Sequence, residues 1–137
     1  MRFSAAEAIR AAGIDEGRLA EAIPRVIPSR VPVYEAPRSM RLLWPRGIRA
    51  MALPWGIYLD PGVAARPLAD LGPLIVHELT HIEQWRRLGP IGWARSYLGD
   101  YLRGRRAGQA HHDAYRAVGL EREARRVARS FGRERPE

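Results

Sequence analysis

Apolar residues recur at helical spacing through the second half of the chain. The first stripe runs from Leu71 to Trp85 and stops at Gly89-Pro90, a pair of residues that ends helices. A second stripe covers residues 93–102, and a third covers residues 120–131. Because each stripe follows the period of an α-helix, the pattern predicts three consecutive amphipathic helices.

The first residues of the chain also carry helix signals. Ser4 and Glu7 have the spacing of a capping box, which predicts a short helix over residues 5–12. A second helical segment is expected over residues 16–26, where Pro24 shortens it. Both segments are brief, so we expect them to pack against the remainder of the chain.

A different pattern begins after residue 30. Residues 31–34 are typical of the start of a strand, and residues 40–44 fit either a turn of helix or a strand. Two further short strands are expected at residues 48–53 and 57–59, joined by a turn at residues 54–56. The middle of the chain therefore predicts a small sheet.

Strand signals that precede helix signals favour an α+β fold over alternating parallel units. The length of 137 residues fits one domain. Within it we expect a helical extension (1–30), a small antiparallel or mixed sheet (31–60), a helical part (67–131) and a flexible tail (132–137). The sheet should pack on the first long helix, with the other helices on the far side.

Composition narrows the possible chemistry. The chain has no cysteine, which excludes disulfides, thiolate metal sites and thiol nucleophiles. No apolar run approaches the roughly 20 residues of a membrane span, and Glu7 interrupts the start where a leader peptide needs an apolar run. We therefore expect a cytoplasmic protein with no membrane partner.

Arginine accounts for all 23 basic residues and gives the chain a formal net charge of +8. Arg122, Arg125, Arg126 and Arg129 are expected to form an outward stripe on the last helix. Nucleic acid is an unfavoured partner, because no aromatic residue lies among these arginines to stack on bases. Any binding should be weak, independent of sequence and sensitive to salt.

Residues 77–81 read His77-Glu78-Leu79-Thr80-His81 and fall inside the first long helix. Two histidines four residues apart lie on one helix face, so both imidazoles can reach one metal ion. Glu78 lies about 100° further round the helix, where it flanks the ion and can take a proton from a metal-bound water. The spacing therefore indicates a zinc site with a general base beside it.

A two-histidine zinc site needs a third protein ligand and an open position for water. Glu121 is the favoured ligand, because Leu120, Ala124 and Val127 define the inward side of the last helix. Alternatives that stay open are Glu123, His111 and His112. Asp100 is expected to face solvent, and Glu83 to point away from the two histidines.

These two motifs resemble those of the zincin metallopeptidases, and in particular the gluzincins. His77 to His81 looks like the HExxH helix, and Glu121-Arg122-Glu123-Ala124 is similar to the ExxA segment that supplies the third ligand. The likeness covers residues 48–131 and is closest to the small minigluzincins. It implies a zinc-dependent peptidase that holds a peptide or protein substrate along the edge strand of residues 48–59.

The sequence departs from the family pattern at two places. No H-x-x-G continuation follows His81, which argues against metzincins, and Arg125 stands where many gluzincins have an acid that supports the histidines. Tyr115 is a candidate for stabilising the oxyanion, or else a packing residue like Tyr97. The alternative function is a catalytically degenerate zincin-like module with a structural or binding role; the sequence does not specify an oligomeric state.

Overall fold

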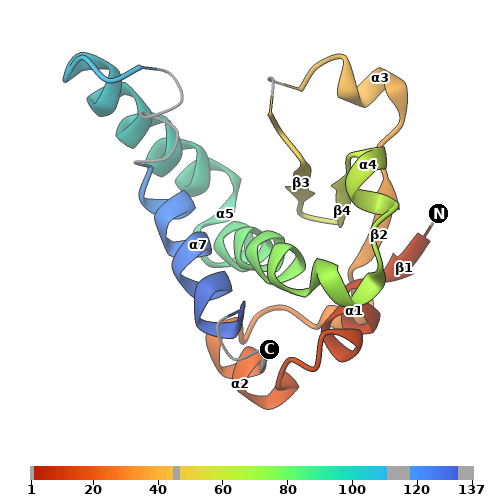
Figure 1. The fold of residues 1–137 in the computed structure, drawn as a ribbon. Helices are drawn as coiled ribbons and strands as arrows, with labels where there is room; N and C mark the ends of the chain where they lie inside the picture. Colours follow the sequence, from red (N-terminus) through yellow and green to blue (C-terminus); the bar gives the residue numbers. More distant parts are fainter. Residues whose placement is uncertain (1, 45–46, 111–117, 133–137) are drawn as a thin grey trace.

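A computed structural model describes residues 2–44, 47–110 and 118–132. It combines a small sheet with helices, which confirms the α+β prediction. In Figure 1 the helical pair α5 and α7 lies on one side of the molecule and the sheet on the other, with α1 and α2 beneath them. The elements in chain order are β1 (Arg2–Ser4), α1 (Ala5–Ala11), α2 (Glu16–Ala22), η1 (Pro28–Arg30), β2 (Pro32–Glu35), α3 (Arg38–Arg41), β3 (Ala50–Leu53), β4 (Gly56–Leu59), α4 (Pro61–Ala64), η2 (Leu68–Leu71), α5 (Gly72–Arg106) and α7 (Gly119–Gly132).

The sheet has the strand order β1-β2-β4-β3 and is mixed. β1 pairs with β2 and β3 pairs with β4 in antiparallel fashion, whereas β2 and β4 run parallel. The predicted hairpin is confirmed, with Met51 opposite Tyr58 across the β3–β4 pair. β3 is the last strand in the order, so one of its edges has no partner within the sheet.

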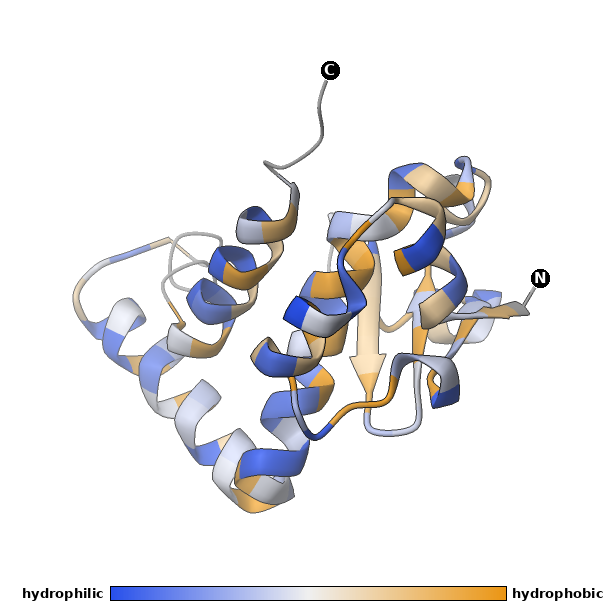
Figure 2. Cartoon of the chain, turned by 90° about the horizontal axis from the view of Figure 1, so that it is seen from below, coloured by the Kyte–Doolittle hydropathy of each residue, from blue (hydrophilic) through white to orange (hydrophobic). Residues whose placement is uncertain are grey.

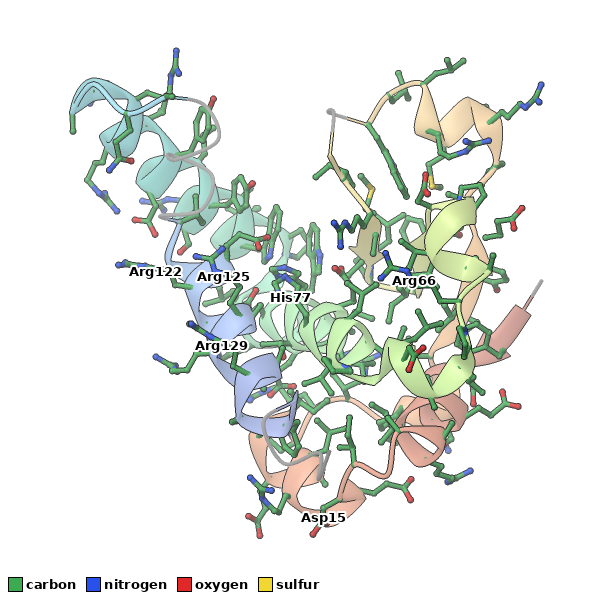
Figure 3. All side chains as sticks on the ribbon, viewed as in Figure 1. Asp15, Arg66, His77, Arg122, Arg125 and Arg129 are labelled. Carbon is green, nitrogen blue, oxygen red and sulfur yellow. The ribbon has the colours of Figure 1, made fainter. Side chains whose placement is uncertain are left out.

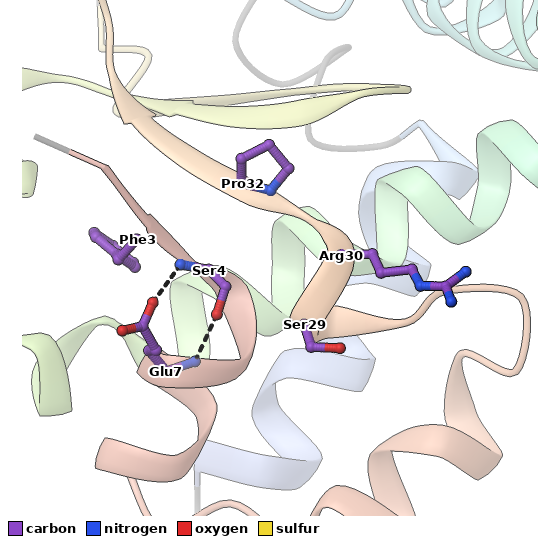
Figure 4. Close-up of a pocket in the computed structure, with 6 residues that line it drawn as sticks. All are labelled: Phe3, Ser4, Glu7, Ser29, Arg30 and Pro32. Atoms are coloured by element: carbon purple, nitrogen blue, oxygen red, sulfur yellow. Dashed lines mark hydrogen bonds between the residues drawn. The ribbon is translucent and has the colours of Figure 1, made fainter.

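The start of the chain contributes a strand that the sequence did not indicate. Residues 1–30 were expected to be helical, but Arg2–Ser4 forms β1 and pairs with β2. Three residues are too few to show a strand period, so only the distant partner reveals them. The predicted capping box is present: Ser4 Oγ accepts from the Glu7 backbone N–H at 3.4 Å, and the Ser4 N–H donates to Glu7 Oε2 at 2.6 Å (Figure 4).

Two further boundaries differ from the sequence expectation. The second helix ends at Ala22 rather than at residue 26, because Ile23 precedes Pro24 and adopts non-helical angles (φ −131°, ψ 67°). The ambiguous segment 40–44 is not a strand: a helical turn, α3, covers Arg38–Arg41. In both places a proline next to the segment decides where the helix begins or ends.

The long helical segment α5 is broken where the sequence predicts a stop. Gly89 has φ 72° and ψ 168°, a conformation that favours glycine, and Pro90 begins the part that follows. The chain then continues as helix in a new direction to Arg106. The first part carries the HExxH residues, and the second part provides a wall beside them.

The core lies between the sheet and the first part of α5. Its fully buried side chains come from both elements, and Phe131 of α7 closes it from the other side. Figure 2 shows the strands mainly in hydrophobic colours and the outer helix turns mainly in hydrophilic ones. Burying each large aliphatic side chain contributes about 1.5–3 kcal/mol. The central members are Val33, Ile57, Leu59, Ile75, Leu79 and Ile82.

The end of the described chain corrects one more boundary. Gly132 is the last residue of α7 rather than the first of a tail, and residues 133–137 lie outside the described residues. Among the described helices, none combines the length and the apolar composition needed to cross a membrane.

Candidate metal centre

The first part of α5 places His77 and His81 one turn apart, with their rings edge to face and 5.0 Å between centroids. The helix is held in this rotation because its opposite face is anchored in the core. Four side chains on that face have no exposed surface: Ile75, Val76, Leu79 and Ile82. The two histidines therefore face away from the core and toward α7.

Glu121 lies in the first turn of α7 and is 5 % exposed. Leu120 and Ala124 bury the neighbouring face of this helix, as the sequence suggested. Asp100 Oδ2 accepts a hydrogen bond of 3.0 Å from the Gly119 backbone N–H. Asp100 is thus not a plain solvent-facing residue: it binds the start of α7 to the second part of α5 and fixes where Glu121 points.

The three predicted ligands are brought together. His77 Nε2 lies 3.3 Å from Glu121 Oε2, and His81 Nε2 lies 2.9 Å from Glu121 Oε1. One ligand atom from each residue lies within 4.8 Å of the other two. Two ligand atoms of a tetrahedral zinc site, each about 2.0–2.2 Å from the metal, lie about 3.4 Å apart. The two histidine–Glu121 distances are close to this separation, so the group could hold a metal ion.

The same three side chains are electrostatically coupled. Burial opposes the charged form of His81, but its hydrogen bond to Glu121 and the nearby charge of Glu78 raise the pKa of His81 to about 9. Burial also disfavours the charged form of Glu121, yet hydrogen bonds from His77 and His81 hold its pKa well below the usual range. Both histidines thus hydrogen-bond to Glu121, and the three side chains form one coupled group.

Glu78 is 6 % exposed and adjoins the three ligands without belonging to the group that could hold an ion. Burial raises the pKa of Glu78, and the charges of His81 and His77 offset part of that increase. A carboxylate beside a cluster that could hold a metal ion, with a pKa raised from that of an exposed acid, is suited to accept and return a proton.

Gln84 supports His81 in a way that the sequence did not reveal. Its Oε1 lies 2.9 Å from His81 Nδ1, and because an amide oxygen can only accept, the Nδ1 atom carries the hydrogen. Nε2 of His81 is then the nitrogen available to a metal. The Gln84 side-chain amide also donates to the Leu120 carbonyl at 2.9 Å and to Glu123 Oε1 at 2.8 Å. This buried amide links α5 to α7 and contacts the imidazole of His81.

The other candidates are placed elsewhere or lie outside the described residues. Glu123 accepts from Gln84 and from Arg87 Nη2 at 3.0 Å, and it is not part of the cluster of possible ligands. Glu83 points away, as expected, and its Oε1 accepts from Arg25 Nη1 at 3.0 Å. His111, His112 and Tyr115 fall within residues 111–117, which the structure does not describe.

Tyr97 is a site residue that sequence reasoning assigned to packing. It lies in the second part of α5, stacked on Trp93 with 5.1 Å between ring centroids, and it lines a cavity with Glu78 and His81. Burial and the charge of Glu121 raise the pKa of Tyr97 to about 12, so its phenol keeps its proton. Its spacing from His81 gave no signal, because the break at Gly89 decides where it points.

Two cavities open on either side of the cluster, and Ile48, Ala50, Glu78 and Glu121 line both of them. One, of about 590 Å³, extends over His77 toward arginines. The other, of about 210 Å³, extends over His81 toward Met51, Trp93 and Tyr97. Together they form a groove along β3 with the possible metal ligands at its centre.

The predicted outward stripe of arginines on α7 is wrong in part. Arg125 is half-buried and lines the larger cavity together with Glu121; Arg129 also lines that cavity but is exposed, as are Arg122 and Arg126. Figure 3 shows Arg125 on the side of α7 toward His77 and Arg122 pointing away. Positions four residues apart differ by only about 40° around a helix, so an inward Glu121 brings Arg125 with it.

Comparison of the chain with family models, with curated proteins and with solved structures gives no match.

Proposed function

We propose that the protein is a zinc-dependent metallopeptidase with a small gluzincin-like fold. The observation that carries the proposal is the convergence of His77, His81 and Glu121 from two helices, with their ligand atoms within 4.8 Å of one another. A site that served structure alone would have no use for a buried carboxylate beside it, and Glu78 occupies that place. The motif, the third ligand and the base support the same chemistry.

His77, His81 and Glu121 would hold the zinc ion, with one position left for water. When bound, zinc supplies a Lewis acid that lowers the pKa of a coordinated water and polarises a carbonyl oxygen. Gln84 keeps the hydrogen of His81 on Nδ1, so that Nε2 faces the site. Glu78 accepts a proton from the attacking water and returns it to the nitrogen of the leaving amine.

The groove along β3 supports a peptide as the substrate. An extended peptide can add to the free edge of β3 by hydrogen bonding to its backbone. Ala50 and Ala52 line the groove with small side chains, which leave room for a second chain above Glu78. Tyr97 lines the same part, and its protonated phenol can donate a hydrogen bond to a carbonyl oxygen that gains charge during the reaction.

The test measures zinc content and peptide hydrolysis together. We expect one zinc per chain in the wild type, little zinc in His77→Ala and Glu121→Ala, and full zinc without hydrolysis in Glu78→Gln. Glu21→Gln, the same change at an exposed position, is the matched control and should retain both properties.

The outcomes separate the candidate functions. Loss of zinc from Glu78→Gln as complete as that from His77→Ala would assign Glu78 a structural role and contradict the proposed mechanism. Stable zinc binding without hydrolysis of a diverse peptide library would favour the catalytically inactive module instead.

A further inference from the structure

The two halves of the groove differ in charge. Arg49, Arg125 and Arg129 line the larger cavity beside His77, whereas the smaller cavity over His81 has no arginine among its lining residues. The three cations come from two elements, because Arg49 immediately precedes β3 and the other two lie on α7. The tertiary structure therefore brings these arginines to one cavity, because they do not belong to a single basic segment of the sequence.

Among the lining residues that the structure describes, the acidic ones are Glu78 and Glu121, and Glu121 is hydrogen-bonded to both histidines. Within residues 2–44, 47–110 and 118–132, no ion pair involves Arg49 or Arg129. A bound Zn²⁺ would balance the two carboxylates, so that the arginines set the sign of the charge in this half of the groove.

We infer that the basic half of the groove binds a carboxylate of the substrate, on the His77 side of the bond to be cleaved. Guanidinium groups bind carboxylates in a bidentate manner, and here the half-buried Arg125 lies on the same cavity as the exposed Arg49 and Arg129. The carboxylate is either an acidic side chain or the free C-terminus of the peptide. On the His81 side, Met51, Trp93 and Tyr97 favour an apolar residue. This inference rests on the proposed peptidase function and assigns its substrate class.

Phosphate groups of nucleic acid are the competing ligand chemistry. Single-stranded nucleic acid is held by aromatic platforms as well as by cations, and the described lining of the basic cavity contains no Phe, Tyr or Trp. The cavity instead adjoins the free edge of β3, where a peptide backbone can pair. These two observations favour a peptide with a carboxylate.

The test measures peptide binding to zinc-loaded Glu78→Gln protein by fluorescence anisotropy. The probes are labelled peptides with an apolar centre and a pair of glutamates on one side of it, in both orders, each matched by a peptide with glutamines. We expect the best glutamate peptide to bind about tenfold more tightly than its match, with a smaller difference at about 200 mM than at about 50 mM salt. Peptides with a free or an amidated C-terminus distinguish the two sources of the carboxylate.

Two double variants with equal loss of charge decide whether the cavity is responsible. The double variant Arg125→Gln/Arg129→Gln should abolish the preference for glutamate over glutamine peptides. The double variant Arg122→Gln/Arg126→Gln, on the outer face of α7, should leave that preference within about twofold of the wild-type value. Arg49→Gln tests the same cavity from a different element, and thermal melts together with zinc content verify that each variant is folded. Loss of the preference only in the cavity variants supports the inference.

Several results would overturn it. The first is equal binding of the glutamate and glutamine peptides, whether the C-terminus is free or amidated. The second is an equal loss of the glutamate preference in the two double variants. The third is displacement of the peptide by a single-stranded oligonucleotide whose binding needs Arg125 and Arg129. Hydrolysis of the same peptides by wild-type protein is scored separately. Cleavage without an acidic preference refutes the inference alone, whereas an arginine-dependent preference without cleavage refutes the proposed function.

Discussion

Replacement of Gln84 by leucine tests how the candidate metal site is held together. Gln84 has no exposed surface and makes three hydrogen bonds, to His81 Nδ1, to the Leu120 carbonyl and to Glu123. Leucine fills a similar volume but can make none of them. The variant leaves the His81 N–H buried without an acceptor and removes a link between α5 and α7.

The expected loss of stability follows from these contacts. The two hydrogen bonds to α7 contribute about 1 kcal/mol each, and the buried His81 donor left without a partner costs about 1–3 kcal/mol, so we expect a loss of roughly 3–5 kcal/mol. Unfolding of 137 residues has an entropy of about 0.3 kcal/mol/K, which converts this loss to a decrease in Tm of about 10–17 °C. Because a partner that orients a metal-binding histidine is lost, zinc affinity should fall about 10- to 100-fold.

Thermal unfolding followed by circular dichroism measures the first quantity, with and without zinc, and competition with a chromophoric chelator measures the second. The matched control is Gln109→Leu, the same change at an exposed glutamine, which should alter neither quantity. Retention of wild-type zinc affinity by a folded Gln84→Leu protein would refute the orienting role. A decrease in Tm without a change in zinc affinity would leave Gln84 with a purely structural role.

Three further predictions follow from the structure. Phe131→Ala removes a 6 % exposed ring from the core and should cost about 3–5 kcal/mol in chemical denaturation; a loss below about 1 kcal/mol would contradict its place there. Arg25→Ala leaves the 4 % exposed side chain of Glu83 without its cation, so it should cost more than the double variant with Glu83→Gln. In metal-free protein the pKa of His81 is raised from its usual 6.5 to about 9. The ion pair between His81 and Glu121 therefore stabilises the folded state fully below pH 6.5, and this stabilisation is lost as the pH rises toward 9. The Tm of chelator-treated protein should therefore fall over this range, and a flat profile would contradict the coupling.

Much of the local structure can be read from the sequence, because its signals lie within a few residues of one another. The capping box at Ser4 and Glu7, the break at Gly89 and the β3–β4 hairpin all have local causes. The pair His77 and His81 is also local, since the period of the helix alone places both on one face.

Other features depend on partners distant in the chain. β1 becomes a strand only by pairing with β2, and Gln84 is a site residue only because Leu120 and Glu123 approach it from α7. Asp100 is identified as a positioning residue only by its hydrogen bond to Gly119. No pattern among the neighbouring residues in the sequence predicts the role of any of them.

The last helix, α7, combines features that local sequence predicts with features that depend on distant contacts. The amphipathic helix and the inward Glu121 follow from its sequence, because Leu120 and Ala124 mark the buried side. Hydrophobicity does not predict that Arg125 and Arg129 line a cavity, since an arginine is expected in water on any helix. Their placement depends on packing: α7 packs on α5 so that Glu121 meets the two histidines, and the same rotation places these arginines along the larger cavity. Helical periodicity is a property of neighbouring residues, whereas the surface that a helix face meets is set by the rest of the fold.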